Sequence, residues 1–168
     1  KTRLQQEVEL ACGTLQFWHD QAASGLGSEP DALAAALAML SQLRYGEDGG
    51  FWVTDQDLLL LADPLQPDLV NTSVRNVRGP DGKTVFADCA DICTSDGQGF
   101  YRHDWPYRDD PQRAEPRLIY VRSFEPWGWV VGTGVYAEDA MGSFLRFQDS
   151  TWYWAVGIMF VLFLYCVF

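Results

Sequence analysis

Few residues in this sequence are of the types that carry acid–base or nucleophilic chemistry. The chain has two histidines, His19 in a predicted helix and His103 in a predicted strand. Motifs such as Cys-x-x-Cys, His-Glu-x-x-His and Gly-x-Ser-x-Gly, whose spacing sets up metal binding or catalysis, do not occur. We therefore expect that the protein is not an enzyme and uses no cofactor, and that any functional site binds a ligand without transforming it.

Cys89 and Cys93 lie four residues apart in a segment that is predicted to form a short helix around Thr84 to Ile92. On a helix their Cα atoms would be about 6 Å apart, which is within the range that a disulfide tolerates. Two interpretations stay open, a Cys89–Cys93 bridge in an oxidising compartment or separate buried thiols. A zinc site made by this pair and a histidine is disfavoured, because the spacing is not a standard one.

The charge balance is strongly acidic. The chain carries 23 Asp and Glu against 12 Lys and Arg, a net charge of −11, and the last charged residue is Asp149. Such a surface disfavours binding to nucleic acid and direct adhesion to anionic lipid. Because segments poor in Lys and Arg are left outside the cytoplasm, the composition favours an extracytoplasmic domain.

The C-terminal residues 152–168 form an uncharged apolar run that begins with Trp152, Tyr153 and Trp154. As a helix it would be roughly 25 Å long, slightly short of the about 30 Å of a hydrocarbon core. The aromatic cluster suits the lipid–water boundary. We expect a membrane anchor in contact with lipid, and a sequence that is a piece of a longer protein or a processed chain.

The elements that must position a site follow from hydrophobic periodicity. Apolar residues at three- and four-residue intervals predict a long helix before Gly25 and Gly27, and Ser28 and Pro30 open a second helix. Five strands follow in the expected order, at Gly50–Thr54, Leu58–Ala62, Gly99–Trp105, Leu118–Phe124 and Trp129–Tyr136, with a long loop at Pro106–Pro116. This order is typical of an α+β domain, one antiparallel sheet with the long helix on one face and the other face left for a ligand.

Several segments together resemble a known family. They are LRYGEDGGFWVTD (43–55), Asp63-Pro64, GPDGK (79–83), GFYRHDWP (99–106) and RLIYVRSFEPWGWVVGTGVYAED (117–139), and they occur in this order. They are similar to the single Cache domain of the small-ligand type, found outside the membrane in chemotaxis receptors and sensor histidine kinases. PWGWVVGTGVY is the most specific piece of the resemblance, which covers about residues 33–139.

The resemblance implies a PAS-like antiparallel sheet behind the long N-terminal helix and a pocket for a small organic acid such as acetate, propionate, lactate or pyruvate. It also implies that the last strand leads to a membrane helix. The sequence departs from the family at Asp63-Pro64, where His-Pro is frequent, and at Arg117, where Lys is common. Asp63 places an acid where an acid ligand would bind, whereas Arg117 keeps the charge and offers a bidentate fork.

A buried carboxylate ligand needs a cation and oriented donors. Arg117 is the expected cation and Arg44 a second one. The remaining candidates are aromatic residues that supply hydroxyl or indole donors or an apolar wall, each of which is otherwise explained by core packing: Tyr120, Tyr101, Trp105 and Trp52.

The predicted organisation is a helix at residues 1–27, a Cache-like sensor domain at 28–139, a linker helix at 140–151 and a transmembrane helix at 152–168. Two functions stay open. One is a sensor on the periplasmic side of the inner membrane that binds a small carboxylate and signals through the membrane helix, in the manner of receptors that often form homodimers. The other is a structural accessory subunit of a larger bioenergetic or photosynthetic membrane complex, with subunits of that complex as partners.

Overall fold

A computed structural model describes residues 2–45, 49–107 and 110–137. Residues 1–135 form one compact unit, and residues 136–168 are counted as a second, of which Tyr136 and Ala137 are described. Within the described ranges, no helix combines the length and the apolar character that crossing a bilayer requires. The linker helix and the membrane helix predicted for 140–168 lie outside the described residues.

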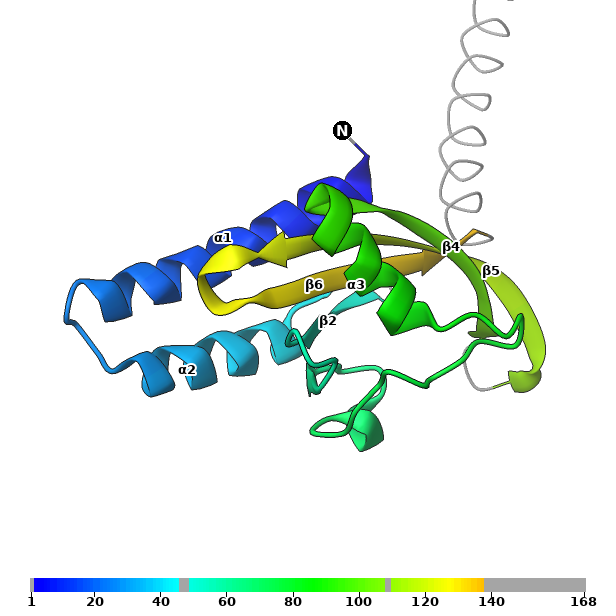
Figure 1. Cartoon of the computed structure of the whole chain (residues 1–168), viewed down its shortest axis with the longest axis horizontal. Helices are drawn as coiled ribbons and strands as arrows, with labels where there is room; N and C mark the ends of the chain where they lie inside the picture. Colours follow the sequence, from blue (N-terminus) through cyan, green and yellow to red (C-terminus); the bar gives the residue numbers. More distant parts are fainter. Residues whose placement is uncertain (1, 46–48, 108–109, 138–168) are drawn as a thin grey trace, which may run out of the picture. The chain divides into compact units, whose positions relative to one another are not determined.

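The first two helices are α1, Arg3–Ala23, and α2, Glu29–Gln42. The backbone N–H of Thr2 donates to Gln5 Oε1 at 2.8 Å, and the Ser28 hydroxyl accepts from the Asp31 N–H at 3.3 Å, so side chains satisfy donors at both helix starts. Both helices lie along the same face of the sheet (Figure 1). The predicted helix pair is confirmed.

Within the described residues the sheet has six strands instead of the predicted five. The strand order is β1-β2-β6-β5-β4, with β3 paired to β2, and the pairings β1–β2, β2–β3, β2–β6 and β4–β5 are antiparallel. The bounds are β1 Arg44–Tyr45, β2 Gly49–Thr54, β3 Leu60–Ala62, β4 Gln98–Tyr107, β5 Asp110–Phe124 and β6 Trp129–Tyr136. The additional strand is β1, whose two residues are too short for a periodic pattern to reveal.

The predicted loop at Pro106–Pro116 is wrong. β4 extends into this segment to Tyr107 and β5 begins at Asp110, and the two strands pair with Asp104 opposite Pro116 and Pro106 opposite Ala114. Pro106 is tolerated because its strand, β4, is at the edge of the sheet. β5 has 15 residues against 8 in β6, so part of β5 extends beyond its inner neighbour and pairs with β4 alone.

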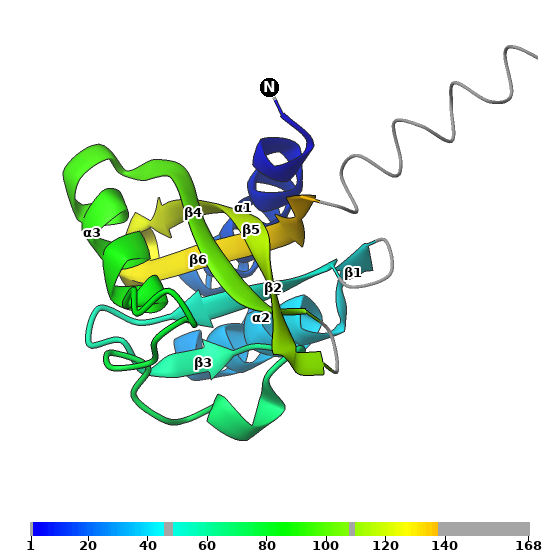
Figure 2. The same cartoon turned by 90° about the vertical axis from the view of Figure 1, so that its right-hand side faces the viewer.

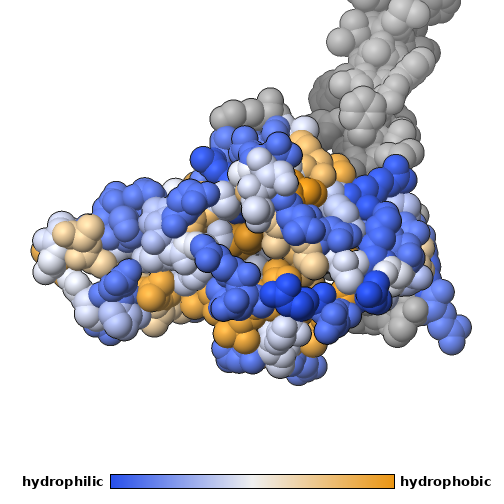
Figure 3. Space-filling view, viewed as in Figure 1, coloured by the Kyte–Doolittle hydropathy of each residue, from blue (hydrophilic) through white to orange (hydrophobic). Residues whose placement is uncertain are grey.

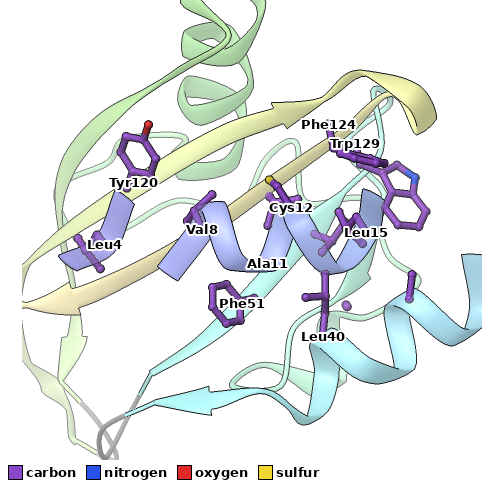
Figure 4. Packing of buried hydrophobic residues seen from close by; sticks show 14 residues of the cluster. Leu4, Val8, Ala11, Cys12, Leu15, Leu40, Phe51, Tyr120, Phe124 and Trp129 are labelled. Carbon is purple, nitrogen blue, oxygen red and sulfur yellow. The ribbon is translucent and has the colours of Figure 1, made fainter. Parts of the chain in front are cut away.

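The sheet separates two apolar cores. One fills the space between the sheet and α1 and α2, and its members include Val8, Leu15 and Phe51 (Figure 4). The other lies under α3, Val85–Asp96, on the opposite face (Figure 2). The face that carries α3 is largely hydrophilic outside, with apolar side chains gathered near its centre and lower edge (Figure 3).

The Cys89–Cys93 bridge, one of the two alternatives left open, is not formed, and both residues are free buried thiols of α3. The two side chains share the apolar face of the helix and pack into the second core. Burial raises the pKa of the Cys89 thiol and raises that of Cys93 to about 12. The thiolate that forms disulfides is therefore scarce at both positions, and the alternative of separate buried thiols holds.

Short segments complete the connections. A 3-10 turn at Pro67–Leu69 follows β3, and another at Glu125–Trp127 joins β5 to β6. The second ends at Gly128, whose φ of 62° lies in the left-handed region that glycine adopts without strain. The predicted turn between the last two strands is thus confirmed.

Candidate functional site

The face of the sheet opposite α1 collects polar and aromatic side chains from three strands. Residues two apart on a strand share a face, which places Tyr101, His103 and Trp105 of β4 together. His103 stands directly opposite Arg117 of β5. Trp52 of β2 belongs to the same face, since it packs in the second core.

These side chains line a small pocket with about 260 Å³ of unfilled space, part of it open to solvent. One wall comes from the first residues of α3, and another comes from the loop after β3. The lining residues are Trp52, Asp63, Gln66, Val85, Phe86, His103, Trp105, Arg117 and Ile119.

Two glycines of β6 give the pocket side chains room to lie across the central strand. A Cβ on Gly132, which pairs with Trp52, would be 2.2 Å from Trp52 Cζ2. A Cβ on Gly134 would be 3.0 Å from Arg117 Nε and 3.0 Å from Ile119 Cγ1. The Gly-Thr-Gly segment of β6 therefore allows both the indole and the guanidinium to cover this strand.

Arg117 supplies a cation to the pocket at 9% exposure. Asp63, also buried, is its nearest acidic neighbour within the lining. Asp63 Oδ1 accepts hydrogen bonds from the N–H groups of Leu65 at 2.8 Å and Gln66 at 3.2 Å, which fixes the turn after β3. Burial raises the pKa of Asp63, while these N–H groups and Arg117 act to lower it.

His103 is 2% exposed and lies between two aromatic rings. It stacks on Tyr101 at 5.8 Å between ring centroids and meets Trp105 edge-on at 5.3 Å. Its Nδ1 is 3.1 Å from the carbonyl oxygen of Asp104. Burial, with the Arg117 charge as the next cause, lowers the pKa of His103 to about 4, so the ring is neutral near pH 7.

The loop of residues 79–83 is attached to β4 beside this histidine. Lys83 Nζ donates to the carbonyl of Arg102 at 3.0 Å, and the Asp104 N–H donates to Asp81 Oδ2 at 3.3 Å. A Cβ on Gly79 would be 2.8 Å from the Asp104 carbonyl oxygen and 3.6 Å from His103 Nδ1. Only a residue without a side chain fits this close approach. Together these contacts hold the GPDGK segment against β4 beside His103.

The comparison with protein families decides the identity of this fold. The family model of "Single Cache domain 2" matches residues 1–150. The chain belongs to the single Cache family. The match includes α1, which the sequence resemblance left out, together with the sheet and the pocket.

Relatives of this Cache domain are receptors. Methyl-accepting chemotaxis protein McpP of Pseudomonas putida is 32% identical over 141 residues, covering 83% of this chain and 25% of that protein. Sensor histidine kinase MctS of Rhizobium johnstonii is 33% identical over 133 residues, covering 79% and 28%. The chain therefore spans about a quarter of the length of these curated relatives.

Solved structures show the same fold. One, reported as "Structural basis for carboxylic acid recognition by a Cache chemosensory domain", has a TM-score of 0.75 and 30% identity, covering 80% of this chain and 91% of that one. Another, "Periplasmic sensor domain of chemotaxis protein", has a TM-score of 0.74 and 33% identity, covering 79% and 92%. The α+β, PAS-like class with an antiparallel sheet is confirmed.

The Cache pocket contains three of the six predicted ligand residues, Arg117, Trp52 and Trp105. Tyr101 lies beside it on the same face, where its hydroxyl donates to Asp88 Oδ2. Ligand contact by these four residues stays a prediction.

The other two candidates lie elsewhere. Tyr120 packs in the core under α1, and its hydroxyl donates to Gln98 Oε1 at 2.8 Å. Arg44 donates to the Pro64 carbonyl at 3.1 Å and holds the end of the loop that contributes Asp63. We therefore withdraw Tyr120 as a ligand residue and assign Arg44 to the loop.

The pocket lining also contains residues that were not among the predicted ligand residues: His103, Gln66, and Val85 and Phe86 of α3. His103 could have been found from the sequence, because it lies two residues from both Tyr101 and Trp105 on one strand and so shares their face. Gln66 and the α3 residues could not, since their approach to the sheet depends on the path of the long connection after β3.

His103 gives the Cache domain a pH-dependent stability. Its pKa is about 4 in the fold against an ordinary 6.5, so between these values the unfolded chain binds a proton that the folded chain does not. Stability is expected to be complete above pH 6.5 and to fall by on the order of 3 kcal/mol as the pH approaches 4, at about 1.4 kcal/mol per pKa unit. Urea unfolding from pH 4 to 7 measures this loss.

The matched variant for this pH series is His103→Gln. Asp63 acts in the opposite sense, because its raised pKa makes the folded chain bind a proton more tightly than the unfolded one. That contribution is common to both proteins, so the difference between their curves isolates the histidine. Parallel curves would show that His103 is not held neutral by the fold.

Proposed function

We propose that this Cache domain is the extracytoplasmic ligand-binding part of a membrane receptor and that its ligand is a short carboxylic acid. The observation that carries the proposal is the buried guanidinium of Arg117 in a small pocket. A planar guanidinium binds a carboxylate through two parallel hydrogen bonds, and Arg117 brings such a group to the wall of the pocket.

The rest of the lining suits a short hydrocarbon tail. Trp52 and Phe86 meet edge-on at 5.1 Å between ring centroids. Ile119, two residues after Arg117 in β5, lies on the same face of the sheet. These apolar walls lower the local dielectric and so strengthen a charge pair beside them. A carboxylate with a tail of one to three carbons combines the charge and the apolar surface that this lining complements.

Asp63 does not prevent acid binding in this proposal. Its Oδ1 already accepts from the Leu65 and Gln66 N–H groups, which gives the side chain a role in shaping the loop. Burial raises its pKa, and an arriving ligand anion acts in the same direction, so both favour protonation of Asp63 when an acid binds. The relatives support the same assignment, since one solved neighbour is described as recognising carboxylic acids.

Signal transmission is also proposed. Ligand binding would favour one of two states of the domain, and residues 138–168, outside the described part, would convey the change to the membrane. The coupling free energy expected for such receptors is about 1–3 kcal/mol. A periplasmic location, contact of residues 152–168 with lipid and dimerisation remain predictions of this proposal.

A binding screen of the purified protein tests the function. Isothermal titration calorimetry and thermal unfolding with acetate, propionate, pyruvate and lactate should reveal at least one acid that binds and raises the melting temperature. Methyl esters of the same acids serve as matched controls, since they keep the tail and lose the charge. If no acid in the panel binds, the carboxylate assignment fails and the structural-subunit alternative gains.

A further inference from the structure

The pocket contains a buried acceptor that a simple carboxylate would leave unused. His103 is 2% exposed and lines the pocket. Its Nε2 has no hydrogen-bond partner among the residues that the structure describes. Buried polar atoms are almost always satisfied by protein, water or ligand, so this nitrogen offers a hydrogen-bonding position to a ligand that enters the pocket.

The contacts of His103 fix the polarity of that nitrogen. The Asp104 carbonyl, 3.1 Å from Nδ1, can only accept, so Nδ1 carries the proton. The ring is neutral, because burial and Arg117 lower the pKa of His103, with Lys83 acting in the same sense and the Asp81 charge and Asp104 carbonyl opposing them. Nε2 therefore presents a lone pair, and its complement is a hydrogen-bond donor.

The register places this acceptor next to the carboxylate partner. His103 and Arg117 are direct cross-strand neighbours on one face of the sheet. Side chains at such positions have Cβ atoms about 4.5–5.5 Å apart. A ligand whose carboxylate binds Arg117 thus has its neighbouring carbon within reach of the imidazole.

We propose that the pocket selects short hydroxy acids, whose carboxylate binds Arg117 and whose hydroxyl donates a hydrogen bond to His103 Nε2. This inference rests on the proposed function and specifies the ligand class for that site. An acid without the hydroxyl leaves Nε2 unsatisfied. A keto acid is worse matched, since its carbonyl oxygen would face the imidazole lone pair.

Matched acids test the selection in the unmodified protein. Lactate and propionate differ only by the hydroxyl, and calorimetry is expected to show lactate binding at least tenfold more tightly than propionate or pyruvate, because a site built around a hydroxyl rejects analogues that lack it. Equal affinities for lactate and propionate would overturn the inference while leaving the proposed function intact. Failure of all three acids to bind would instead remove the proposed function.

Variants and spectroscopy locate the effect. His103→Phe should reduce the lactate preference to less than threefold, whereas His19→Gln, on α1 and outside the pocket lining, should leave it unchanged. The ¹⁵N resonance of His103 Nε2 in the unmodified protein should shift with lactate and not with propionate, with His19 as internal reference. The assignment to this nitrogen would be overturned if the His103→Phe variant keeps its preference for lactate and if lactate does not shift the Nε2 resonance of the unmodified protein.

Discussion

Arg117→Met is expected to lower the affinity for every acid that binds the protein by at least about 100-fold. The guanidinium is the cation of the pocket lining, and methionine replaces it with an apolar chain of similar length. Charge-assisted hydrogen bonds contribute about 1.5–3 kcal/mol each, and the bidentate geometry gives two of them. At 1.4 kcal/mol per tenfold change, their loss accounts for the expected decrease, which calorimetry measures directly.

Two further variants separate charge from geometry. Arg117→Lys keeps the charge but loses the planar fork, so an intermediate, roughly tenfold loss is expected. Arg122→Met removes another arginine of β5, five residues away, whose side chain projects from the opposite face of the sheet. It therefore changes the net charge equally without touching the pocket. Unchanged affinity in Arg117→Met would place the acid outside this pocket.

Removal of Arg117 should not unfold the domain. The variant eliminates a buried charge, and loss of the Arg117 charge adds to burial in raising the pKa of Asp63, which favours the uncharged form of that carboxyl group. The loss of binding and the retention of fold are therefore separable in one sample, by calorimetry and by thermal unfolding.

The helices and the inner strands could be predicted because local patterns determine them. The spacing of Leu4, Val8 and Leu15 indicates a one-sided helix, and that face is buried in the first core. The prediction failed where tertiary pairing decides. Pro106 and Pro116 read as loop residues, but pairing along an edge strand accommodates them in a β-hairpin.

Part of the site was also accessible from the sequence, which predicted Trp52, Trp105 and Arg117. Alternation along β5 would have rejected Tyr120, since it is three residues from Arg117 and must project from the other face. The same rule applied to β4 would have added His103. Asp63 was recognised as unusual, but its role in holding the turn depends on two backbone N–H groups that no sequence pattern reveals.

The glycines of β6 carry the second large prediction. Gly132→Ala places a Cβ 2.2 Å from Trp52 Cζ2, with further side-chain atoms of the same indole at 2.4 and 2.9 Å. Trp52 is 5% exposed and packs edge-on against Phe86, so it has little room to move. Overpacking of this kind typically costs 1–3 kcal/mol, and we expect a loss of about 2–3 kcal/mol in urea unfolding.

Gly13→Ala is the matched control, because the same change at this position in α1 should stabilise the protein. A Cβ on Gly13 meets nothing within 4 Å, and alanine is favoured over glycine in a helix by about 0.5–1 kcal/mol. The two substitutions thus have opposite predicted signs for one added methyl group. Since Trp52 is a wall of the pocket, Gly132→Ala should also weaken acid binding, whereas Gly13→Ala should not. A Gly132→Ala protein with unchanged stability and affinity would show that the central strand does not constrain the indole, and that the Gly-Thr-Gly segment is not needed to shape the site.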